Sequence, residues 1–175
     1  AQIDPGAVAA IVIETVQGEG GFIATPPRFL QRIRELCTQH GIVYVADEVQ
    51  CGFGRTGKLF AVEHYGIVPD LIATAKSLAA GMPLAAVTGR ADIMDAPHPG
   101  GLGGTYSGNP LSCVAAVEAI QMIRQPEFLD RATAIGARLR QHLLDLQAEI
   151  ALIGDVRGVG PMLVMELVKD RETKT

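Results

Sequence analysis

Two side chains that could do chemistry together, a lysine and an aspartate, each follow a short apolar run of the chain. Asp47 follows residues 42–46, and Lys76 follows residues 71–75. Both runs have the length and composition of buried parallel strands, and ligands of open α/β sheets bind outside the carboxyl ends of such strands. The sequence therefore predicts that a primary amine and a carboxylate reach the same edge of a sheet.

An amine and a carboxylate at such an edge are the two fixed groups that pyridoxal phosphate needs. A lysine holds the aldehyde of this cofactor as a Schiff base, and a carboxylate keeps the pyridine nitrogen protonated, so that the ring can act as an electron sink. The alternative is an ordinary, partly buried ion pair between Lys76 and Asp47, which is the commoner arrangement for these residue types considered without their surroundings.

The composition argues against several classes of protein. The chain has 175 residues, 48% of them hydrophobic, which is enough for one domain with a core. Its net charge of −4, with acids and bases interspersed, argues against nucleic acid or an anionic membrane surface as a partner. No apolar run approaches the roughly 20 residues of a membrane span. The three cysteines and four histidines lack the spacing of a metal site, and the odd cysteine count fits a reduced, cytoplasmic protein.

The first predicted unit is a strand, a helix and a second strand. Residues 9–13 are apolar and predict the first strand. Thr25 is a favourable N-cap with Pro26 at the first helical position, and Gly41 suits the residue after the last turn. The strand that ends at Asp47 follows at once, which predicts a βαβ crossover.

The middle of the chain predicts loops and further strands. A glycine-rich loop at 52–57 is followed by a short helix near 60–65. Another strand is predicted at 84–88, and the segment 97–104 must be irregular because proline and glycine are frequent in it.

The last third of the chain predicts helices and a hairpin. A helix is expected over about 110–124, with an apolar face formed by Val114, Val117, Ile120 and Ile123. A second helix over about 127–149 precedes two short strands separated by Gly158 and Gly160. This change of pattern predicts a domain boundary near Pro126, with 1–125 as the central part of a large domain and 126–175 as the beginning of a small one.

Three polar or glycine-rich segments each have two interpretations. The loop at 52–57 has the Gly-x-Gly-x-x-Gly spacing of a dinucleotide site, but no long helix begins there and no acidic ribose partner is evident, so that interpretation is weak. Hydroxyl groups and a helix start at 103–110 favour a phosphate site, although a capped turn has the same composition. Glu14 and Glu19 either face a substrate amine or an arginine, or are solvated in a surface loop.

Read together, five stretches closely resemble the class-III, pyridoxal-phosphate-dependent aminotransferases. They lie in the order of that family and span nearly the whole chain: 13–21 (IETVQGEGG), 45–57 (VADEVQCGFGRTG), 69–83 (PDLIATAKSLAAGMP), 100–110 (GGLGGTYSGNP) and 154–166 (GDVRGVGPMLVME). Within the family, the resemblance is strongest to the bacterial 4-aminobutyrate aminotransferases. It implies an α/β fold, part of the large domain of fold-type-I pyridoxal enzymes with a mostly parallel sheet and flanking helices, plus the start of an α+β small domain.

The resemblance implies a role for each matching residue of the cofactor site. Lys76 is the Schiff-base lysine, and Asp47 is the partner of the pyridine nitrogen. Val49 packs against one face of the ring, and Gln50 hydrogen-bonds the ring hydroxyl. Thr105 is the phosphate ligand that each subunit of a homodimer lends to the other subunit's cofactor.

At the substrate end, the resemblance implies that Glu19 is a switch. It pairs with a substrate-site arginine when a monocarboxylate ω-amine binds, and it gives that arginine up to the α-carboxylate of glutamate. Glu14 lies next to the same site. Two residues depart from the family pattern, because Thr15 replaces a proline and Cys51 lies where serine is frequent. Both lie outside the roles just given, and we interpret them as tolerated variation.

The activity implied for the full-length protein is transamination of 4-aminobutyrate and 2-oxoglutarate to succinic semialdehyde and glutamate. An acetylornithine or ornithine aminotransferase is an alternative, because these enzymes share the Gln-Gly-Glu stretch at 17–19. A non-catalytic fragment with half an active site is another. The chain has no initiator methionine, and the family's phosphate loop, ring-stacking aromatic residue and carboxylate-binding arginines have no counterpart in it. We therefore expect an internal piece of a larger chain, inactive alone.

Overall fold

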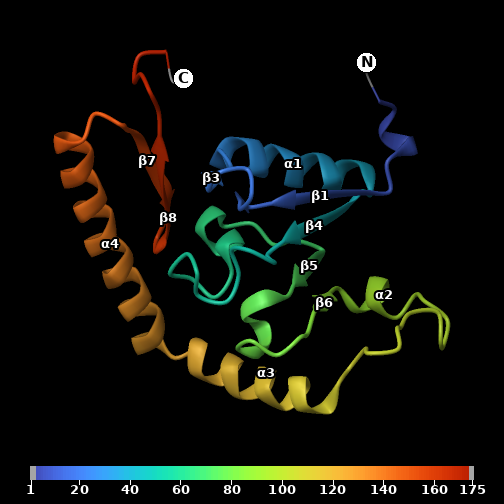
Figure 1. Cartoon of the computed structure of the whole chain (residues 1–175). Coiled ribbons are helices and arrows are strands. Elements are labelled where there is room, and N and C mark those ends of the chain that lie inside the picture. Colours follow the sequence, from blue (N-terminus) through green and yellow to red (C-terminus); the bar gives the residue numbers. More distant parts are fainter. Residues whose placement is uncertain (1–2, 174–175) are drawn as a thin grey trace.

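The computed structural model describes residues 3–173 and is built around a four-stranded sheet (Figure 1). The strands lie in the order β1 (Ala10–Glu14), β4 (Val43–Asp47), β5 (Leu71–Thr74) and β6 (Ala86–Gly89). β1, β4 and β5 are parallel, and β6 is antiparallel to β5. The two strands predicted before Asp47 and Lys76 are therefore confirmed as parallel neighbours.

Helix α1 (Pro27–His40) connects β1 to β4, as the βαβ prediction requires. Its buried residues Leu30 and Cys37 pack with Tyr44 of β4 in one apolar cluster. The helix ends as predicted at Gly41, whose φ of 66° lies in the left-handed region and lets its N–H donate to the carbonyl of Cys37.

The predicted start of α1 is wrong by one residue. Pro26 occupies the N-cap position, and the first helical residue is Pro27. A residue that precedes proline is disfavoured in the helical region, so Pro26 stays extended with a ψ of 130°. The Thr25 hydroxyl donates instead to the carbonyl of Glu14 at 3.2 Å, which ties the approach to the helix to the end of β1.

Short elements fill the connections between the strands. A small antiparallel hairpin, β2 and β3, lies between β1 and α1, and the 3-10 helices η1, η2 and η3 and the short helix α2 lie elsewhere in the loops. Their bounds are Val16–Gln17 (β2), Ile23–Ala24 (β3), Pro5–Ala7 (η1), Ala61–Tyr65 (η2), Lys76–Ala79 (η3) and Ala91–Met94 (α2). Element η2 matches the short helix predicted near 60–65, and the segment 97–104 contains no helix or strand, as predicted.

The glycine-rich loop at 52–57 is a packing element. The N–H of Gly54 donates to the carbonyl of Lys58, and the N–H of Gly57 donates to the carbonyl of Gly54, so the loop closes on itself. A Cβ on Gly57 would lie 2.7 Å from Thr133 of α4, which shows how closely the loop approaches that helix. No long helix follows the loop, so the dinucleotide interpretation finds no support.

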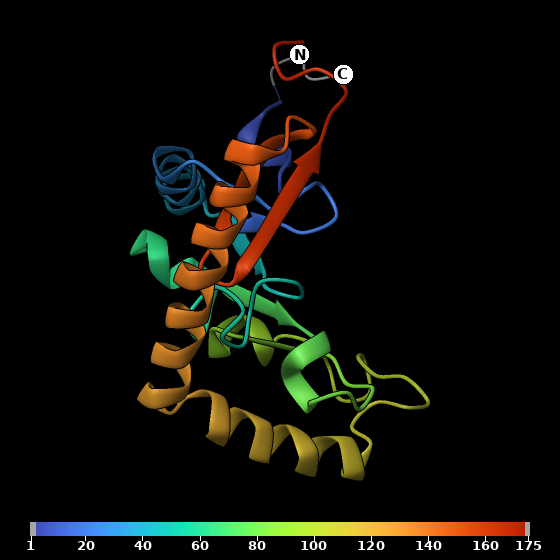
Figure 2. The same cartoon turned by 60° about the vertical axis from the view of Figure 1, so that its left-hand side comes forward.

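Two long helices and a hairpin complete the chain. Helix α3 (Pro110–Ile123) meets α4 (Pro126–Glu149) at an angle, and the antiparallel strands β7 (Ile153–Val159) and β8 (Met162–Leu167) lie against α4 (Figures 1 and 2). Strand β7 also contacts β3. Among the helices within residues 3–173, none is both long and apolar enough to cross a membrane.

The apolar face predicted for α3 is wrong for two of its four members. Val114 and Val117 are 65% and 52% exposed. The helix instead buries the small residues Ala116 and Ala119. Ala116 and Ile123 belong to the same apolar cluster as the end of η3. Helix α3 packs along η3, and small side chains permit that close approach, whereas the valines would hold the two elements apart.

Helix α4 begins at Pro126, the residue near which the sequence predicts a domain boundary. The division into 1–125 and 126–175 stays a prediction. Residues 1–2 and 174–175 of these two ranges lie outside the described residues.

Candidate active site

The carboxyl edge of the sheet carries both members of the predicted pair. Strand β4 ends at Asp47, which is level with Ala73 of β5 in the parallel register. Lys76 follows β5 after a single intervening residue, Ala75, and is the first residue of η3. The amine and the carboxylate therefore come from neighbouring strands at one edge.

Lys76 has a backbone conformation that is uncommon for a lysine. Its φ of 45° lies in the left-handed region, and Ala80 at the other end of η3 has a φ of 49°. The turn leaves the Lys76 side chain exposed. Strained residues of this kind gather at functional sites, where the surrounding structure holds them in place.

Lys76 and Asp47 do not form the ion pair that was the alternative interpretation. Asp47 Oδ1 accepts a hydrogen bond from the N–H of Val49 at 3.1 Å, and Oδ2 accepts none from any residue that the structure describes. Within residues 3–173, Lys76 has no ion-pair partner. Both groups are therefore available to a ligand, and Val49 is half-buried beside the aspartate.

Lys76 lines a mainly apolar hollow of about 650 Å³. Arg55 and Ser77 lie beside it, and Arg55 Nε donates to Ser77 Oγ at 2.8 Å. The other walls come from the glycine-rich loop, α3 and α4, and include Phe53, Ala119, Met122, Ile123 and Phe128.

The turn between β2 and β3 brings three predicted residues together. Gln50 Nε2 donates to Glu19 Oε1 at 2.9 Å, so the proposed ring ligand and the proposed switch glutamate are in direct contact. Glu14 Oε2 accepts the N–H of Gly18 at 2.8 Å and closes the turn. Gly18 is required here, because a Cβ at this position would lie 2.6 Å from the Gln50 side chain.

Glu48 is a buried residue of this edge that sequence reasoning missed. Its carboxylate is fully buried and accepts hydrogen bonds from the Ala61 and Val62 N–H groups at 2.9 and 2.8 Å. The Cys51 thiol donates to it at 3.1 Å, and the Thr15 hydroxyl donates at 3.4 Å. Burial raises the pKa of Glu48, and these donors act against that rise. The signal in the sequence was the second acid directly after the strand, which the alternation of side chains turns to the opposite face from Asp47.

Both residues that depart from the family pattern, Thr15 and Cys51, thus contact the same carboxylate. The Cys51 pKa is raised by its burial and by the neighbouring Glu48 charge, so this thiol is an unreactive part of the packing.

Thr105 does not line the hollow that Lys76 lines. It lines a second hollow of about 600 Å³ with residues 83–85 and 104–108, and its side chain is exposed. Asn109 Oδ1 accepts the N–H groups of Leu111 and Ser112 at 3.0 and 3.2 Å, so the start of α3 is a capped turn. The phosphate interpretation of this segment stays a prediction. The structure therefore does not bring Thr105 and Lys76 of one chain to one hollow.

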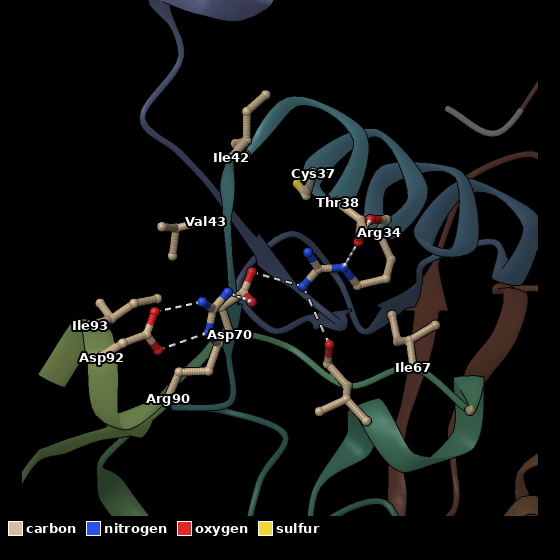
Figure 3. Close-up of a pocket in the computed structure, with 13 residues that line it drawn as sticks. Arg34, Cys37, Thr38, Ile42, Val43, Ile67, Asp70, Arg90, Asp92 and Ile93 are labelled. Atoms are coloured by element: carbon tan, nitrogen blue, oxygen red, sulfur yellow. Dashed lines mark hydrogen bonds and ion pairs between the residues drawn. The ribbon is translucent and has the colours of Figure 1, made fainter.

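The opposite, amino edge of the sheet holds a different polar cluster (Figure 3). Asp70, which precedes β5, accepts hydrogen bonds from Arg34 at 2.8 Å, Arg90 at 3.0 Å and the Tyr44 N–H at 2.8 Å. Burial acts to raise the pKa of Asp70, but these donors outweigh it and hold the pKa below its ordinary value. Asp92 forms an ion pair with Nη2 of Arg90. The cluster is satisfied internally and ties α1, β4, β5 and β6 together.

Metal binding finds no support. Among residues 3–173, no group of three or more histidine, cysteine, aspartate or glutamate side chains could hold a metal ion. All three cysteines are free.

The amino-acid sequence matches that of a known family. The sequence pattern of "Aminotransferase class-III" matches residues 2–175. The chain belongs to the class-III aminotransferase family. The resemblance stated from the sequence is therefore confirmed, and so is the expected fold class.

Individual relatives support this assignment over most of the chain. The chain is 56% identical over 166 residues to 4-aminobutyrate aminotransferase GabT of Escherichia coli (strain K12). The match covers 95% of this chain and 39% of the relative. It is 52% identical over 169 residues to 5-aminovalerate aminotransferase DavT of Pseudomonas aeruginosa, covering 97% of this chain and 40% of the relative. The chain thus spans about two fifths of the length of the curated relatives it matches.

A solved structure of the family shows the same fold. The taurine:2-oxoglutarate aminotransferase from Bifidobacterium kashiwanohense, in complex with PLP and glutamate, matches with a TM-score of 0.89 at 32% identity. The match covers 97% of this chain and 39% of that one. Class-III aminotransferases are pyridoxal-phosphate-dependent, as the sequence predicts for this chain.

Proposed function

We propose that the full-length protein transfers the amino group of an ω-amino acid, 4-aminobutyrate, to 2-oxoglutarate with pyridoxal phosphate as cofactor. The observation that carries this proposal is the pair at the carboxyl edge. The exposed Lys76 amine lies in a strained turn without an ion-pair partner among residues 3–173, and one Asp47 oxygen accepts no hydrogen bond from these residues. The names of the relatives, which act on 4-aminobutyrate and 5-aminovalerate, support an ω-amino acid as donor.

The residues at this edge fit the cofactor. In the proposal Lys76 would bind the aldehyde, and Asp47 would accept a hydrogen bond from the protonated pyridine nitrogen. Val49 would pack on the ring, and Gln50 would hydrogen-bond the ring hydroxyl. When bound, pyridoxal phosphate supplies the aldehyde that takes up the amine and the ring that accepts electrons from the substrate carbon. The Lys76 amine would take the proton from that carbon as a general base and give it back as a general acid.

We assign substrate recognition to Glu19, and we assign Glu14 a supporting role in the same turn. Glu19 is exposed at the tip of the β2–β3 turn, so its free oxygen can pair with a cation brought by the rest of the protein. Glu14 is already engaged by the Gly18 N–H, and we assign it the support of the turn rather than direct substrate contact.

The first experiment tests Lys76. Borohydride reduction of the full-length protein with bound cofactor should fix the pyridoxyl group on the peptide that contains Lys76. Lys76→Ala should lose this label and the turnover of 4-aminobutyrate, whereas the exposed Lys58→Ala should keep both. A pyridoxyl group on another lysine, or transamination by Lys76→Ala without added amine, would contradict the assignment.

The donor is tested by comparing kcat/KM for 4-aminobutyrate, 5-aminovalerate, ornithine and acetylornithine. We expect 4-aminobutyrate to be preferred. Preference for ornithine or acetylornithine would favour the related alternative instead. The isolated 175-residue chain should be inactive even with excess pyridoxal phosphate, because in our proposal the carboxylate-binding arginines lie outside it.

We further propose a homodimer with shared sites, in which Thr105 contacts the cofactor phosphate of the partner subunit. Thr105 and Lys76 of one chain line different hollows, which supports this arrangement. Mixing inactive Lys76→Ala and Thr105→Ala subunits should restore one working site per heterodimer, since two-fold symmetry gives each site one residue from each chain. Verified heterodimers that stay inactive would place Thr105 in its own subunit's site.

A further inference from the structure

The turn that carries Glu19 is held from two sides. On the side of the cofactor residues, Gln50 Nε2 bonds Glu19 Oε1 at 2.9 Å. Within the turn, the N–H of Gly21 donates to the carbonyl of Gly18 at 3.0 Å. On the other side stands the β7–β8 hairpin, which lies more than a hundred residues later in the chain and contacts β3.

Arg157 of β7 makes the polar contact between this hairpin and the turn. Its Nε donates to the carbonyl of Gly21 at 2.7 Å, across 136 residues of sequence. The fit is close, because a Cβ on Gly21 would lie 2.8 Å from the guanidinium, and Gly21 has a φ of 109° that disfavours any other residue.

The guanidinium is itself fixed by two carboxylates. Arg157 Nη1 donates to Asp155 at 3.0 Å and to Glu166 of β8 at 2.5 Å. An arginine can satisfy these acceptors and a carbonyl at once because its five N–H groups form a rigid planar fork. A lysine, with one ammonium nitrogen, cannot occupy both places.

Apolar packing closes the remaining side of the contact. Phe22, which follows Gly21, packs with Val159 and Met162 of the hairpin against the buried Val16. The turn thus has no freedom to shift without moving the hairpin.

We propose that Arg157 is a positioning residue that fixes the β2–β3 turn and so makes the position of Glu19 depend on the β7–β8 hairpin. The consequence is for specificity, because Glu19 is the group assigned to distinguish an ω-amine with one carboxylate from glutamate with two. This inference rests on the role of Glu19 under the proposed function. The hairpin becomes part of the donor-selecting machinery although it contributes no group that touches substrate.

The matched variants are Arg157→Lys and Glu166→Gln in the full-length protein. Arg157→Lys keeps a cation for the carboxylates and removes the Nε–H donor to Gly21. Glu166→Gln weakens the ion pair within the hairpin and leaves that donor in place, so a merely structural ion pair would make the two variants alike.

The first readout needs no cofactor. Hydrogen exchange of the peptide spanning 14–24 in the cofactor-free protein should be about tenfold faster in Arg157→Lys and nearly unchanged in Glu166→Gln, because local opening reports the loss of a local contact. Equal exchange in wild type and Arg157→Lys would overturn the proposal.

The second readout compares the two half-reactions. Arg157→Lys should lower kcat/KM for 4-aminobutyrate about tenfold and change the value for glutamate less than about twofold. Such a result means that the variant loses transition-state binding for one donor and not for the other. Equal losses for both donors would refute the link to specificity. Glu19→Gln separates the two proposals: if it alters the donor ratio and Arg157→Lys does not, only the inference on Arg157 fails. If Glu19→Gln leaves the ratio unchanged as well, the role proposed for Glu19 fails, and this inference fails with it.

Discussion

The Asp70 cluster allows a prediction that compares a buried and an exposed carboxylate bound to the same arginine. Asp70 and Asp92 both bind Arg90, at 3.0 and 2.6 Å, but the Asp70 side chain is 8% exposed and that of Asp92 is 64% exposed. Asp70→Asn and Asp92→Asn are therefore the same chemical change at one arginine, made inside and outside the protein.

The magnitude follows from the contacts of each carboxylate. Asp70 accepts three hydrogen bonds, two of them from arginines, and the Arg34 side chain that pairs with it is only 19% exposed. Hydrogen bonds to charged groups contribute about 1.5–3 kcal/mol against about 1 for neutral ones, and breaking a buried pair costs up to about 5 kcal/mol. Because asparagine keeps one acceptor oxygen, we expect Asp70→Asn to lose about 3 kcal/mol. Asp92→Asn should change the free energy of unfolding little, because solvent screens an exposed ion pair.

The assay is urea denaturation of the cofactor-free, full-length protein, repeated from neutral pH into the acid range. The folded state holds the Asp70 pKa below the 3.8 of a free aspartate, so between these two values the unfolded state binds more protons and stability rises with pH. The stabilisation is complete above the unfolded pKa and is lost as pH falls through the folded pKa. The gap between wild type and Asp70→Asn should close over the same range. Equal losses for the two variants, or a gap that stays constant in acid, would refute the reasoning.

Three further predictions follow from packing at the carboxyl edge. Glu48→Gln should lower the free energy of unfolding by about 2–4 kcal/mol, because the new NH2 group would face backbone N–H groups that are themselves donors. The exposed Glu35→Gln should be nearly neutral in the same denaturation assay. Gly160→Ala should displace the hairpin, since its Cβ would lie 2.3 Å from the carbonyl of Thr56 at a φ of 54°; a melting temperature equal to that of wild type would exclude this clash. Cys113 should react with a thiol reagent well before the two buried cysteines, whose pKa values are raised by burial; simultaneous labelling, followed by peptide mass, would show that the core opens easily.

The features predicted well from the sequence are those fixed by local signals. The runs before Asp47 and Lys76 are short, apolar and bounded by turn residues, and strands of this kind carry their identity in a few adjacent positions. Gly41 was recognisable as a helix end because the left-handed conformation it adopts excludes most other residues. The meeting of the amine and carboxylate at one edge followed from strand direction alone.

The features predicted poorly depend on partners far away in the chain. The buried face of α3 is set by its approach to η3, and periodicity could not tell which of two faces, valines or alanines, would meet that neighbour. Glu48 owes its burial to donors from η2 and from the turn after β1, which no local pattern specifies. Arg157 could be read as a surface arginine until its contact with Gly21 across the fold was visible.

The left-handed backbone conformation of Lys76 affects which residue selection for stability would favour at this position. A non-glycine residue in that conformation costs about 1–2 kcal/mol, and glycine would relieve this while losing about 0.5–1 kcal/mol through its greater freedom when unfolded. At this position a glycine would thus fold at least as well as the lysine. Selection for stability alone therefore gives the lysine no advantage, and thermostabilising substitutions chosen without regard to chemistry would tend to remove it. Under the proposed function, the amine that binds the cofactor is the reason that a lysine occupies this turn.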